Sequence, residues 1–169
     1  MGSATLDAAA LVRALELKPH PEGGFYRETF RASALPFELP GRGARSASTA
    51  IYFLLGAGDF SAFHRVRSDE VWHHYLGAPL ELHCLDAASG HGLVRLGSDV
   101  VAGERPQHVV PAGVFQAARP SGPGFALCGC TVAPGFDFAD FEMPSRAELC
   151  ALFPKFRELV TELTRAPNG

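Results

Sequence analysis

Residues 60–76, FSAFHRVRSDEVWHHYL, carry the pattern that decides the fold. In residues 60–66, the side chains at even-numbered positions (Phe, Ala, His and Val) would share one face of a strand. The segment 67–69, Arg-Ser-Asp, is typical of a turn. Residues 70–75 then return as a second run that contains aromatic and β-branched side chains. Two such runs around a short polar turn indicate an antiparallel hairpin, so we expect strands at 60–66 and 70–75.

Similar short runs follow one another along most of the chain, with glycine and proline between them. The sequence holds 18 Gly and 13 Pro. Strands that recur about every 8 to 12 residues between such turns are typical of an all-β sandwich or barrel. We therefore expect an all-β jelly-roll barrel with minor helices. Its other strands are expected at residues 25–32, 49–55, 80–85, 92–97, 106–110, 114–118, 125–132 and 138–143.

The two ends of the chain are expected to be helical. Residues 5–17 place apolar side chains at helical spacing, behind an N-terminal cap supplied by Thr5 or Asp7. Near the other end, Ser145 is expected to cap a short helix, which a further apolar stripe follows. We predict one domain over residues 1–169, with the core barrel at about 22–143 and a helical segment at 145–164.

The amino-acid composition of the chain argues against two classes of binding partner, nucleic acids and membranes. The 15 basic and 18 acidic side chains leave a net charge of −3. A chain without excess positive charge is not expected to bind nucleic acid polymers or an anionic membrane surface. No stretch approaches the roughly 20 apolar residues that span a bilayer, and no secretory signal pattern is visible. We expect a cytoplasmic protein whose four cysteines are reduced.

The strands at 60–66 and 70–75 carry the candidate chemistry. Alternation places His64 on one face of the first strand and Glu70, Trp72 and His74 on one face of the second. If both of these faces line the barrel interior, two imidazoles and a carboxylate lie close together. Such a set can bind a metal ion or transfer protons. Parity alone leaves both faces open, because His73 occupies the opposite one.

These residues resemble the motifs of the cupin superfamily. The segment 64–70 followed by Gly77 is similar to the first cupin motif, and the segment 111–116 is similar to the second. The runs at 21–29, 68–73, 110–116 and 134–138 together resemble a small single-domain cupin subfamily of unknown function, compared with sugar epimerases. The resemblance covers about residues 8–155. It implies a double-stranded β-helix and a homodimer formed through the first strands of the chain.

The usual cupin metal ligands are only partly present. Val66 and Gln116 stand where the motifs usually have histidines, so His64 and Glu70 alone keep their positions. His74 could replace a lost imidazole and Gln116 could offer its amide oxygen. A divalent ion (Zn, Fe, Mn or Ni) held by His64, Glu70, His74 and Gln116 is therefore one hypothesis, and a cavity without metal is the other.

Without metal, the same residues suit proton transfer. The resemblance to sugar epimerase-like cupins implies a histidine base and a phenol acid, for which His64 and Tyr26 are the candidates, with Glu70 orienting His64. Further candidates for substrate binding are Glu28, Trp72, His74, Gln116 and Ser48. Arg31, Arg42 and Arg45, together with Ser46 and Ser48, could receive a phosphate group, or could belong to an exposed basic loop.

Three functions remain open from the sequence. The first is an epimerase or isomerase that acts on a sugar or nucleotide sugar by His/Tyr proton transfer. The second is a non-catalytic protein that binds a small metabolite, and the third is a metal-dependent cupin isomerase or oxygenase. All three expect a small-molecule pocket inside the barrel.

Overall fold

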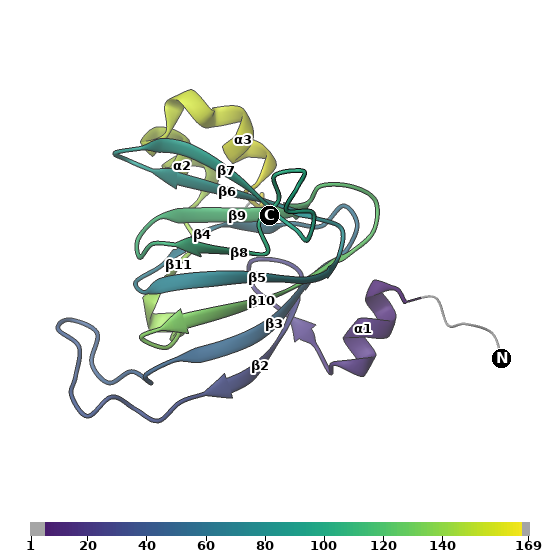
Figure 1. Cartoon of the computed structure of the whole chain (residues 1–169). Coiled ribbons are helices and arrows are strands. Elements are labelled where there is room, and N and C mark those ends of the chain that lie inside the picture. Colours follow the sequence, from purple (N-terminus) through teal and green to yellow (C-terminus); the bar gives the residue numbers. More distant parts are fainter. Residues whose placement is uncertain (1–5, 167–169) are drawn as a thin grey trace.

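Two antiparallel β-sheets face each other in the computed structural model, which describes residues 6–166. The first sheet has the strand order β1-β2-β3-β10-β5-β8 and the second has β11-β4-β9-β6-β7. The fold is therefore all-β with small helices at its ends, as the turn spacing predicts (Figure 1). The strands are β1 (Lys18–Pro19), β2 (Phe25–Arg31), β3 (Thr49–Leu55), β4 (Ser61–Val66), β5 (Asp69–Gly77), β6 (Leu80–Asp86), β7 (Gly90–Leu96), β8 (Gln107–Val110), β9 (Phe115–Pro120), β10 (Ala126–Ala133) and β11 (Phe141–Glu142).

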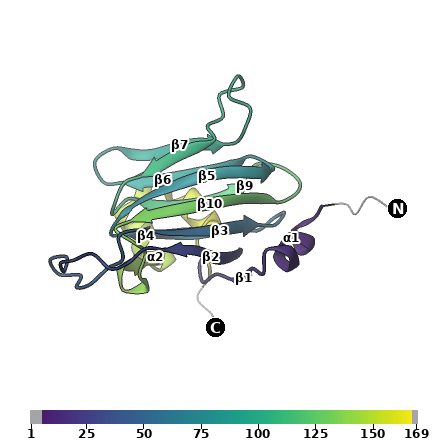
Figure 2. The ribbon, with the colours of Figure 1, turned by 60° about the horizontal axis from the view of Figure 1, so that its bottom comes forward.

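The hairpin expected over residues 60–76 is wrong in one respect. Strands β4 and β5 exist, but they are not hydrogen-bonded to each other. Strand β4 pairs with β9 and β11, whereas β5 pairs with β10 and β8 in the opposite sheet. Figure 2 shows β10 between β5 and β3. The turn at 67–68 therefore carries the chain from one sheet to the other. His64 and Glu70 face each other across the space between the sheets rather than along a ladder.

The strand expected at 138–143 is confirmed only at residues 141–142. The chain there forms a short 3-10 helix, η1 (Phe138–Asp140), before the two-residue strand β11. The Asp137 side chain accepts a hydrogen bond from the Ala139 N–H and caps this turn. The Asp140 carboxylate binds the guanidinium groups of Arg42 and Arg45. These local polar contacts outweigh the strand preference of the phenylalanines on either side.

The helices lie on the outside of the sheets. Helix α1 (Ala8–Ala14) is capped by Asp7, while Thr5 lies outside the described residues. Helix α2 (Arg146–Leu152) has the expected Ser145 cap, completed by Glu148, and is followed by η2 (Pro154–Phe156) and α3 (Arg157–Glu162). None of the described helices is long and apolar enough to cross a membrane.

Of the three apolar clusters among the described residues, two join the sheets to each other and to the C-terminal helices. One fills the space between the sheets and includes Phe53, Leu82 and Trp72. The other joins the outer face of the second sheet to α2 and α3 through Phe63, Leu149 and related side chains. Each fully buried leucine or phenylalanine contributes about 1.5–3 kcal/mol of burial free energy. The first cluster fills only part of the barrel, and a cavity occupies the remainder.

Candidate functional site

A cavity of about 390 Å³ lies between the sheets. Its wall is built from the inner faces of β2, β3, β4, β5 and β10, together with the segment before β2 and the segment around η1. Phe136, Phe138 and Phe141 form its aromatic side. Its titratable side chains are Lys18, His20, Glu22, Tyr26, Glu28, Arg31, His64, Glu70, Cys130 and Asp137.

His64 points into this cavity and is fixed by contacts on both ring nitrogens. Its Nδ1 lies 2.8 Å from the Ala62 carbonyl oxygen, and its Nε2 lies 3.2 Å from Glu22 Oε2. A carbonyl oxygen can only accept, so Nδ1 carries the hydrogen and donates it. The neutral ring therefore presents a lone pair to Glu22. The ring also stacks on Phe141 with 5.3 Å between centroids.

Glu22 lies between two imidazole rings. Its Oε2 is 3.2 Å from His64 Nε2 and 3.5 Å from His20 Nδ1, while its Oε1 accepts a hydrogen bond from the Ser61 hydroxyl at 2.9 Å. His20 Nδ1 is itself an acceptor, because the Glu22 backbone N–H donates to it at 3.3 Å. Both imidazole nitrogens thus turn lone pairs toward Glu22. A protonated carboxyl group satisfies this arrangement.

The pKa shifts agree with that assignment. Burial raises the pKa of Glu22 to about 8, although the hydrogen bond from Ser61 opposes the shift. Burial also lowers the pKa of His64, and burial together with the nearby His64 lowers the pKa of His20 to about 4. At neutral pH, the Glu22–His64 pair accordingly holds one ionisable proton between its oxygen and nitrogen atoms.

The backbone around Glu22 explains why this side chain faces inward. Gly23 and Gly24 have φ angles of 114° and 69°, which side chains other than glycine rarely adopt. A Cβ atom on Gly24 would also lie 2.5 Å from the Leu54 carbonyl oxygen. The Asp59 carboxylate accepts from the Gly24 N–H at 3.0 Å, and the Glu22 carbonyl accepts from the Ala62 N–H at 2.8 Å. The turn is thereby joined to the start of β4.

Glu70 occupies another part of the cavity wall. It accepts a hydrogen bond from the Gln116 amide, whose oxygen accepts from the Trp72 indole N–H at 2.7 Å. Because an indole N–H can only donate, this chain fixes the orientation of the Gln116 amide. Burial raises the pKa of Glu70, while nearby His64 and the hydrogen bonds from Gln116 and Cys130 oppose the shift. The carboxyl group in contact with the His64 ring is that of Glu22, not Glu70.

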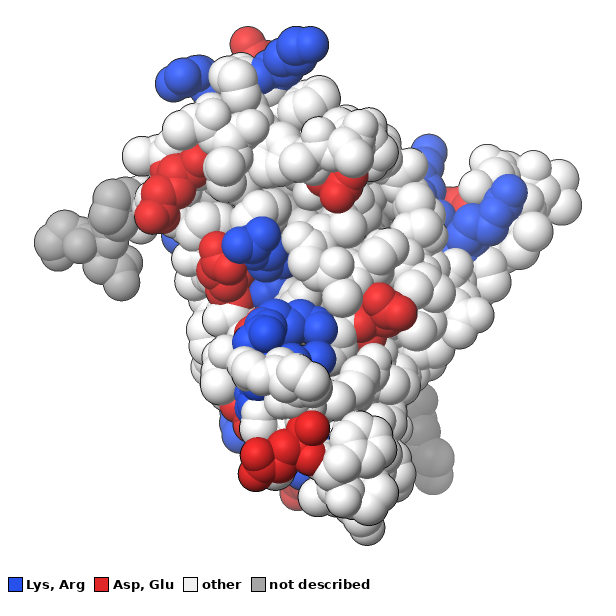
Figure 3. All heavy atoms as spheres, turned by 90° about the vertical axis from the view of Figure 1, so that its left-hand side faces the viewer, with Lys and Arg blue, Asp and Glu red and all other residues white. Residues whose placement is uncertain are grey.

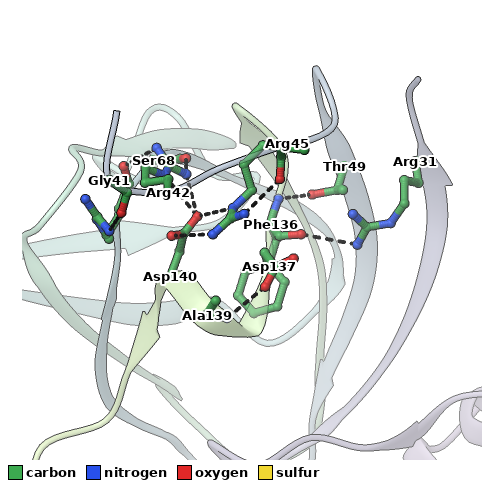
Figure 4. A network of polar contacts seen from close by, with 12 residues as sticks. Arg31, Gly41, Arg42, Arg45, Thr49, Ser68, Phe136, Asp137, Ala139 and Asp140 are labelled. Atoms are coloured by element: carbon green, nitrogen blue, oxygen red, sulfur yellow. Dashed lines mark hydrogen bonds and ion pairs between the residues drawn. The ribbon is translucent and has the colours of Figure 1, made fainter. Parts of the chain in front are cut away.

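Tyr26 and Glu28 lie on the cavity wall supplied by β2. The Tyr26 ring packs edge-on against His20 with 4.5 Å between centroids, and Lys18 Nζ lies 5.2 Å from the Tyr26 centroid. Glu28 pairs with Arg31 at 2.7 Å, and Arg31 also donates to the Phe136 carbonyl oxygen (Figure 4). These side chains bring a phenol, a carboxylate and two cations to the same cavity.

Four of the predicted substrate-binding residues do not line the cavity. Trp72 and Gln116 are buried behind the cavity wall. Trp72 donates a hydrogen bond to Gln116, and Gln116 donates one to Glu70. His74 lies further along β5 and contacts the Ala78 carbonyl oxygen through Nε2 at 3.1 Å. Ser48 donates to the Val132 carbonyl oxygen at 3.2 Å. Glu28 alone of this group faces the cavity.

The proposed metal ligands do not form one donor set. His74 lies outside the cavity, and Gln116 is engaged by both Trp72 and Glu70. His64 uses Nδ1 for a carbonyl oxygen and Nε2 for Glu22. Within residues 6–166, no group of three or more His, Cys, Asp or Glu side chains is arranged to hold a metal ion. These side chains therefore do not fit the metal shell that the fold family implies.

The basic loop forms ion pairs with the protein itself. Asp140 binds Arg42 at 2.6 Å and Arg45 at 2.8 Å, and Arg42 also donates to Ser68 (Figure 4). Arg42 and Arg45 are thus engaged by a carboxylate, while only Arg31 of the three predicted phosphate ligands reaches the cavity. Figure 3 shows basic and acidic side chains in small mixed groups on the face that lies at the left of Figure 1.

The sequence interpretation missed Glu22 and His20 as site residues. Glu22 lies 42 positions from His64, so strand periodicity carries no information about their contact. The available signal was the sequence Pro21-Glu22-Gly23-Gly24, in which a lone carboxylate stands in a turn with two adjacent glycines. Glycines at such a turn indicate a backbone forced into one path, and hence a fixed direction for the side chain between them.

Solved structures of similar shape confirm the fold. Protein SO0799 from Shewanella oneidensis is 38% identical, with a TM-score of 0.87, over 95% of this chain and 99% of that one. A hypothetical protein from Leishmania major is 31% identical, with a TM-score of 0.86, over 95% and 100% of the two chains. Oxalate decarboxylase from Bacillus subtilis shares the fold alone, at 16% identity and a TM-score of 0.55, over 86% of this chain and 36% of that one.

Sequence comparison gives the same assignment. The uncharacterized protein YML079W of Saccharomyces cerevisiae is 32% identical over an alignment of 146 residues, and the match covers 77% of this chain and 71% of the yeast protein. Residues 9–144 match the family model described as Cupin superfamily (DUF985). The motifs at 64–77 and 111–116, the two facing sheets and these relatives lead to one conclusion, that the chain belongs to the cupin superfamily, in its DUF985 family.

Proposed function

We propose that the cavity binds a small polar carbonyl compound, such as a sugar or nucleotide sugar, and moves a proton at the carbon next to its carbonyl group. The observation that carries this proposal is the 3.2 Å contact between His64 Nε2 and Glu22 Oε2, inside a cavity that also contains the Tyr26 side chain. A carboxyl–imidazole pair with one shared proton near neutral pH is suited to general acid–base catalysis.

The reaction balances with the residues present. The Glu22–His64 pair first releases its shared proton to water and then takes the proton from the substrate carbon. The electron pair of the broken C–H bond forms an enolate with the carbonyl group. Tyr26 then donates a proton to the same carbon from the other face. The centre is inverted, and exchange with water restores both groups. Lys18 and Arg31 in the cavity wall favour the negative charge of the enolate.

The dimensions and lining support a substrate of this class. A volume of about 390 Å³ lies at the small end of ligand pockets, which suits one sugar ring with its substituents. Glu28, Arg31 and Lys18 offer hydrogen bonds to hydroxyl groups, and the three phenylalanines offer an apolar face for the ring carbons.

Solvent exchange in D₂O tests the proposal without knowledge of the product. A panel of keto sugars, aldoses, sugar phosphates and nucleotide sugars is incubated with the protein, and ¹H NMR measures deuterium entering the carbon next to the carbonyl group. We expect exchange with the wild-type protein on at least one compound. His64→Gln and Glu22→Gln should slow it at least a hundredfold.

Two further variants separate the roles. Tyr26→Phe should retain exchange at the substrate carbon but lose the inverted product, because only the second proton transfer is affected. His74→Gln is the matched control, since this histidine does not line the cavity, and it should behave as wild type. Binding of a panel compound without any exchange would instead identify a non-catalytic binding protein.

We also propose that two copies of the chain associate along β2. Strand β1 covers only Phe25 and Tyr26 of β2, through the pairs Pro19–Phe25 and Lys18–Tyr26. Within the described residues, the outer edge of β2 beyond Tyr26 has no strand beside it. Such an edge is a template for another strand, and Phe30 adds an apolar side chain that is 55% exposed.

A further inference from the structure

A second, larger groove lies outside the barrel, between the start of β4 and the C-terminal helices α2 and α3. Its volume is about 1020 Å³. One wall is the segment 20–23, whose Glu22 side chain points the other way, into the barrel cavity. The groove is therefore a separate space that shares this turn with the cavity.

Three arginines from different elements line this groove. Arg146 begins α2, Arg157 begins α3, and Arg165 follows α3. The Arg146 guanidinium donates to the Thr164 hydroxyl at 2.9 Å and to the Thr164 carbonyl oxygen at 2.8 Å, directly before Arg165. Arg157 lies one helical turn before Thr161, another groove residue. All three arginines thus belong to the lining of one groove.

The positive charge of the groove is not balanced by its own lining. Among residues 6–166, no aspartate or glutamate lines it. Arg165 contacts Asp59 at 2.9 Å, whereas Arg146 and Arg157 form no ion pair within the described chain. The nearby carboxylates are engaged elsewhere: Glu148 caps α2 through Ser145, and Glu162 pairs with Arg119.

The position of Arg165 depends on Gly23. A Cβ atom at residue 23 would lie 2.1 Å from Arg165 Nη2, so the absence of a side chain there leaves room for the guanidinium. Arg165 also donates to the Phe60 carbonyl oxygen at 2.6 Å and lies over the Phe60 ring. One of the three cations is thus fixed in place at the wall of the groove, before any ligand arrives.

We propose that this groove is a binding site for a phosphate group, either free or as a monoester of a small metabolite. Guanidinium groups match phosphate oxygens with pairs of parallel hydrogen bonds, and a dianion with several oxygens can engage more than one arginine at once. The Thr161 hydroxyl already donates to the Arg157 carbonyl oxygen at 2.8 Å, so the arginines supply the donors for the phosphate. A single phosphate is much smaller than 1020 Å³, so the groove has room for the organic part of a monoester.

Isothermal titration calorimetry with inorganic phosphate tests the site, at pH 7.5 and at constant ionic strength set with sodium chloride. We expect saturable binding to the full chain. Arg157→Gln should weaken it at least fivefold, because this exposed side chain makes no ion pair in the described structure and its loss leaves the fold intact. Arg95→Gln, an exposed arginine on β7 outside the groove, is the matched control and should bind as wild type.

A second measurement locates the phosphate. In ¹H–¹⁵N spectra, the amides of Gly23, Ala62 and Ala147 should shift with phosphate, and those of β7 should not. Glycerol 3-phosphate binding more tightly than inorganic phosphate assigns the groove to a monoester, and the reverse order assigns it to free phosphate. The proposal is overturned by a lack of saturable binding, by full binding in Arg157→Gln, or by an equal loss in Arg95→Gln.

Discussion

Glu22 is both buried and ionisable, and this combination destabilises a folded protein unless neighbouring groups compensate. Its side chain is 7% exposed, and burial of an ionised carboxylate there would be strongly unfavourable. The chain avoids this cost by turning acceptor nitrogens of His64 and His20 toward the carboxyl group, and burial outweighs the opposing hydrogen bond from Ser61. The neutral carboxyl form is thereby favoured, and its proton remains available near physiological pH.

The first prediction concerns the pH dependence of stability. The pKa of Glu22 is about 8 in the folded chain and 4.5 otherwise, so the folded state holds the extra proton between these values. Stability from this group is therefore complete below about pH 4.5 and decreases as pH rises towards 8. Since one pKa unit corresponds to about 1.4 kcal/mol, wild type should lose about 2–3 kcal/mol relative to Glu22→Gln between pH 6 and pH 8.

Urea unfolding at several pH values between 6 and 8.5 measures this difference. The glutamine variant keeps the shape of the side chain and a donor for His64 Nε2, but it cannot ionise. Glu28→Gln is the control, because this carboxylate lies in the same cavity wall but is 40% exposed and paired with Arg31. Parallel pH profiles for wild type and Glu22→Gln would show that Glu22 does not carry the proton.

Among the connecting segments, the loop between β2 and β3 has an unusual anchor. Asp140 in η1 receives hydrogen bonds from Arg42 and Arg45, and all three side chains are about nine-tenths buried or more. The hydrogen bonds from Arg45 and Arg42 lower the pKa of Asp140 to about 2. The same η1 segment carries Phe138 of the cavity wall, so the loop and the wall are held by one carboxylate.

We predict that Asp140→Asn frees the loop. Removing one partner of a buried ion pair costs about 3–5 kcal/mol, because the arginines keep their charge without compensation. Hydrogen exchange should accelerate at the amides of Arg42, Gly43 and Ala47, which bond within the loop or to residue 33, and should stay unchanged in β6. Tm should fall as well.

The neighbouring pair provides the control for this experiment. Glu142 also binds an arginine, Arg65, at 2.8 Å, but these side chains are 54% and 40% exposed. Glu142→Gln should therefore cost less than about 1 kcal/mol and leave the loop protected. Equal effects of the two substitutions would mean that Asp140 acts as an ordinary surface charge.

The C-terminal helices allow a sharper test of packing. Leu149 in α2 is fully buried against the second sheet, whereas Leu152 in the same helix is 61% exposed. Leu149→Ala should lower the free energy of unfolding by about 2–5 kcal/mol, and Leu152→Ala by less than about 1 kcal/mol. Chemical unfolding of both variants measures these two free energies. Similar losses would show that the helices do not depend on this interface.

Strand positions were predictable to different degrees. Residues 49–55 form β3 as expected, because a run of β-branched and aromatic side chains between turn residues has few alternatives. The pairing of β4 and β5 was not predictable, because a short polar turn is compatible with a hairpin and with a crossing between sheets. Alternation placed Glu70 and Trp72 on the same face of their strand whichever strands pair, but it left open whether that face and the face of His64 point inward.

The site was less predictable than the sheets. Its central contact joins Glu22 to His64, and only the tertiary fold brings that turn to the start of β4. His74 has the parity of Trp72, yet it lies further along β5, beyond the end of the cavity. Parity determines the face of a sheet but not the depth at which a side chain meets a cavity.

Considered as a whole, the molecule has two sheets with different exposure. The second sheet is covered on its outer face by α2 and α3, while α1 packs near Leu54 and Leu127 of the first. One edge of the first sheet is formed by the short strand β1 and by the part of β2 that β1 does not cover. The other edge is β8. Self-association can use either of these edges, and side-chain substitutions distinguish them.

The dimer proposed along β2 predicts a solution mass of twice the 18.0 kDa chain mass, measured by size-exclusion chromatography with light scattering. Phe30→Asp places a charge beside the unpaired part of β2 and should weaken association at least tenfold, because the charge would lose its hydration in the interface. Val109→Asp makes the same kind of change on β8, where Val109 is 48% exposed, and should leave the dimer intact. Circular dichroism confirms that each variant is folded. A monomeric wild-type chain would exclude this interface, and dissociation by Val109→Asp instead of Phe30→Asp would move it to the opposite edge of the same sheet.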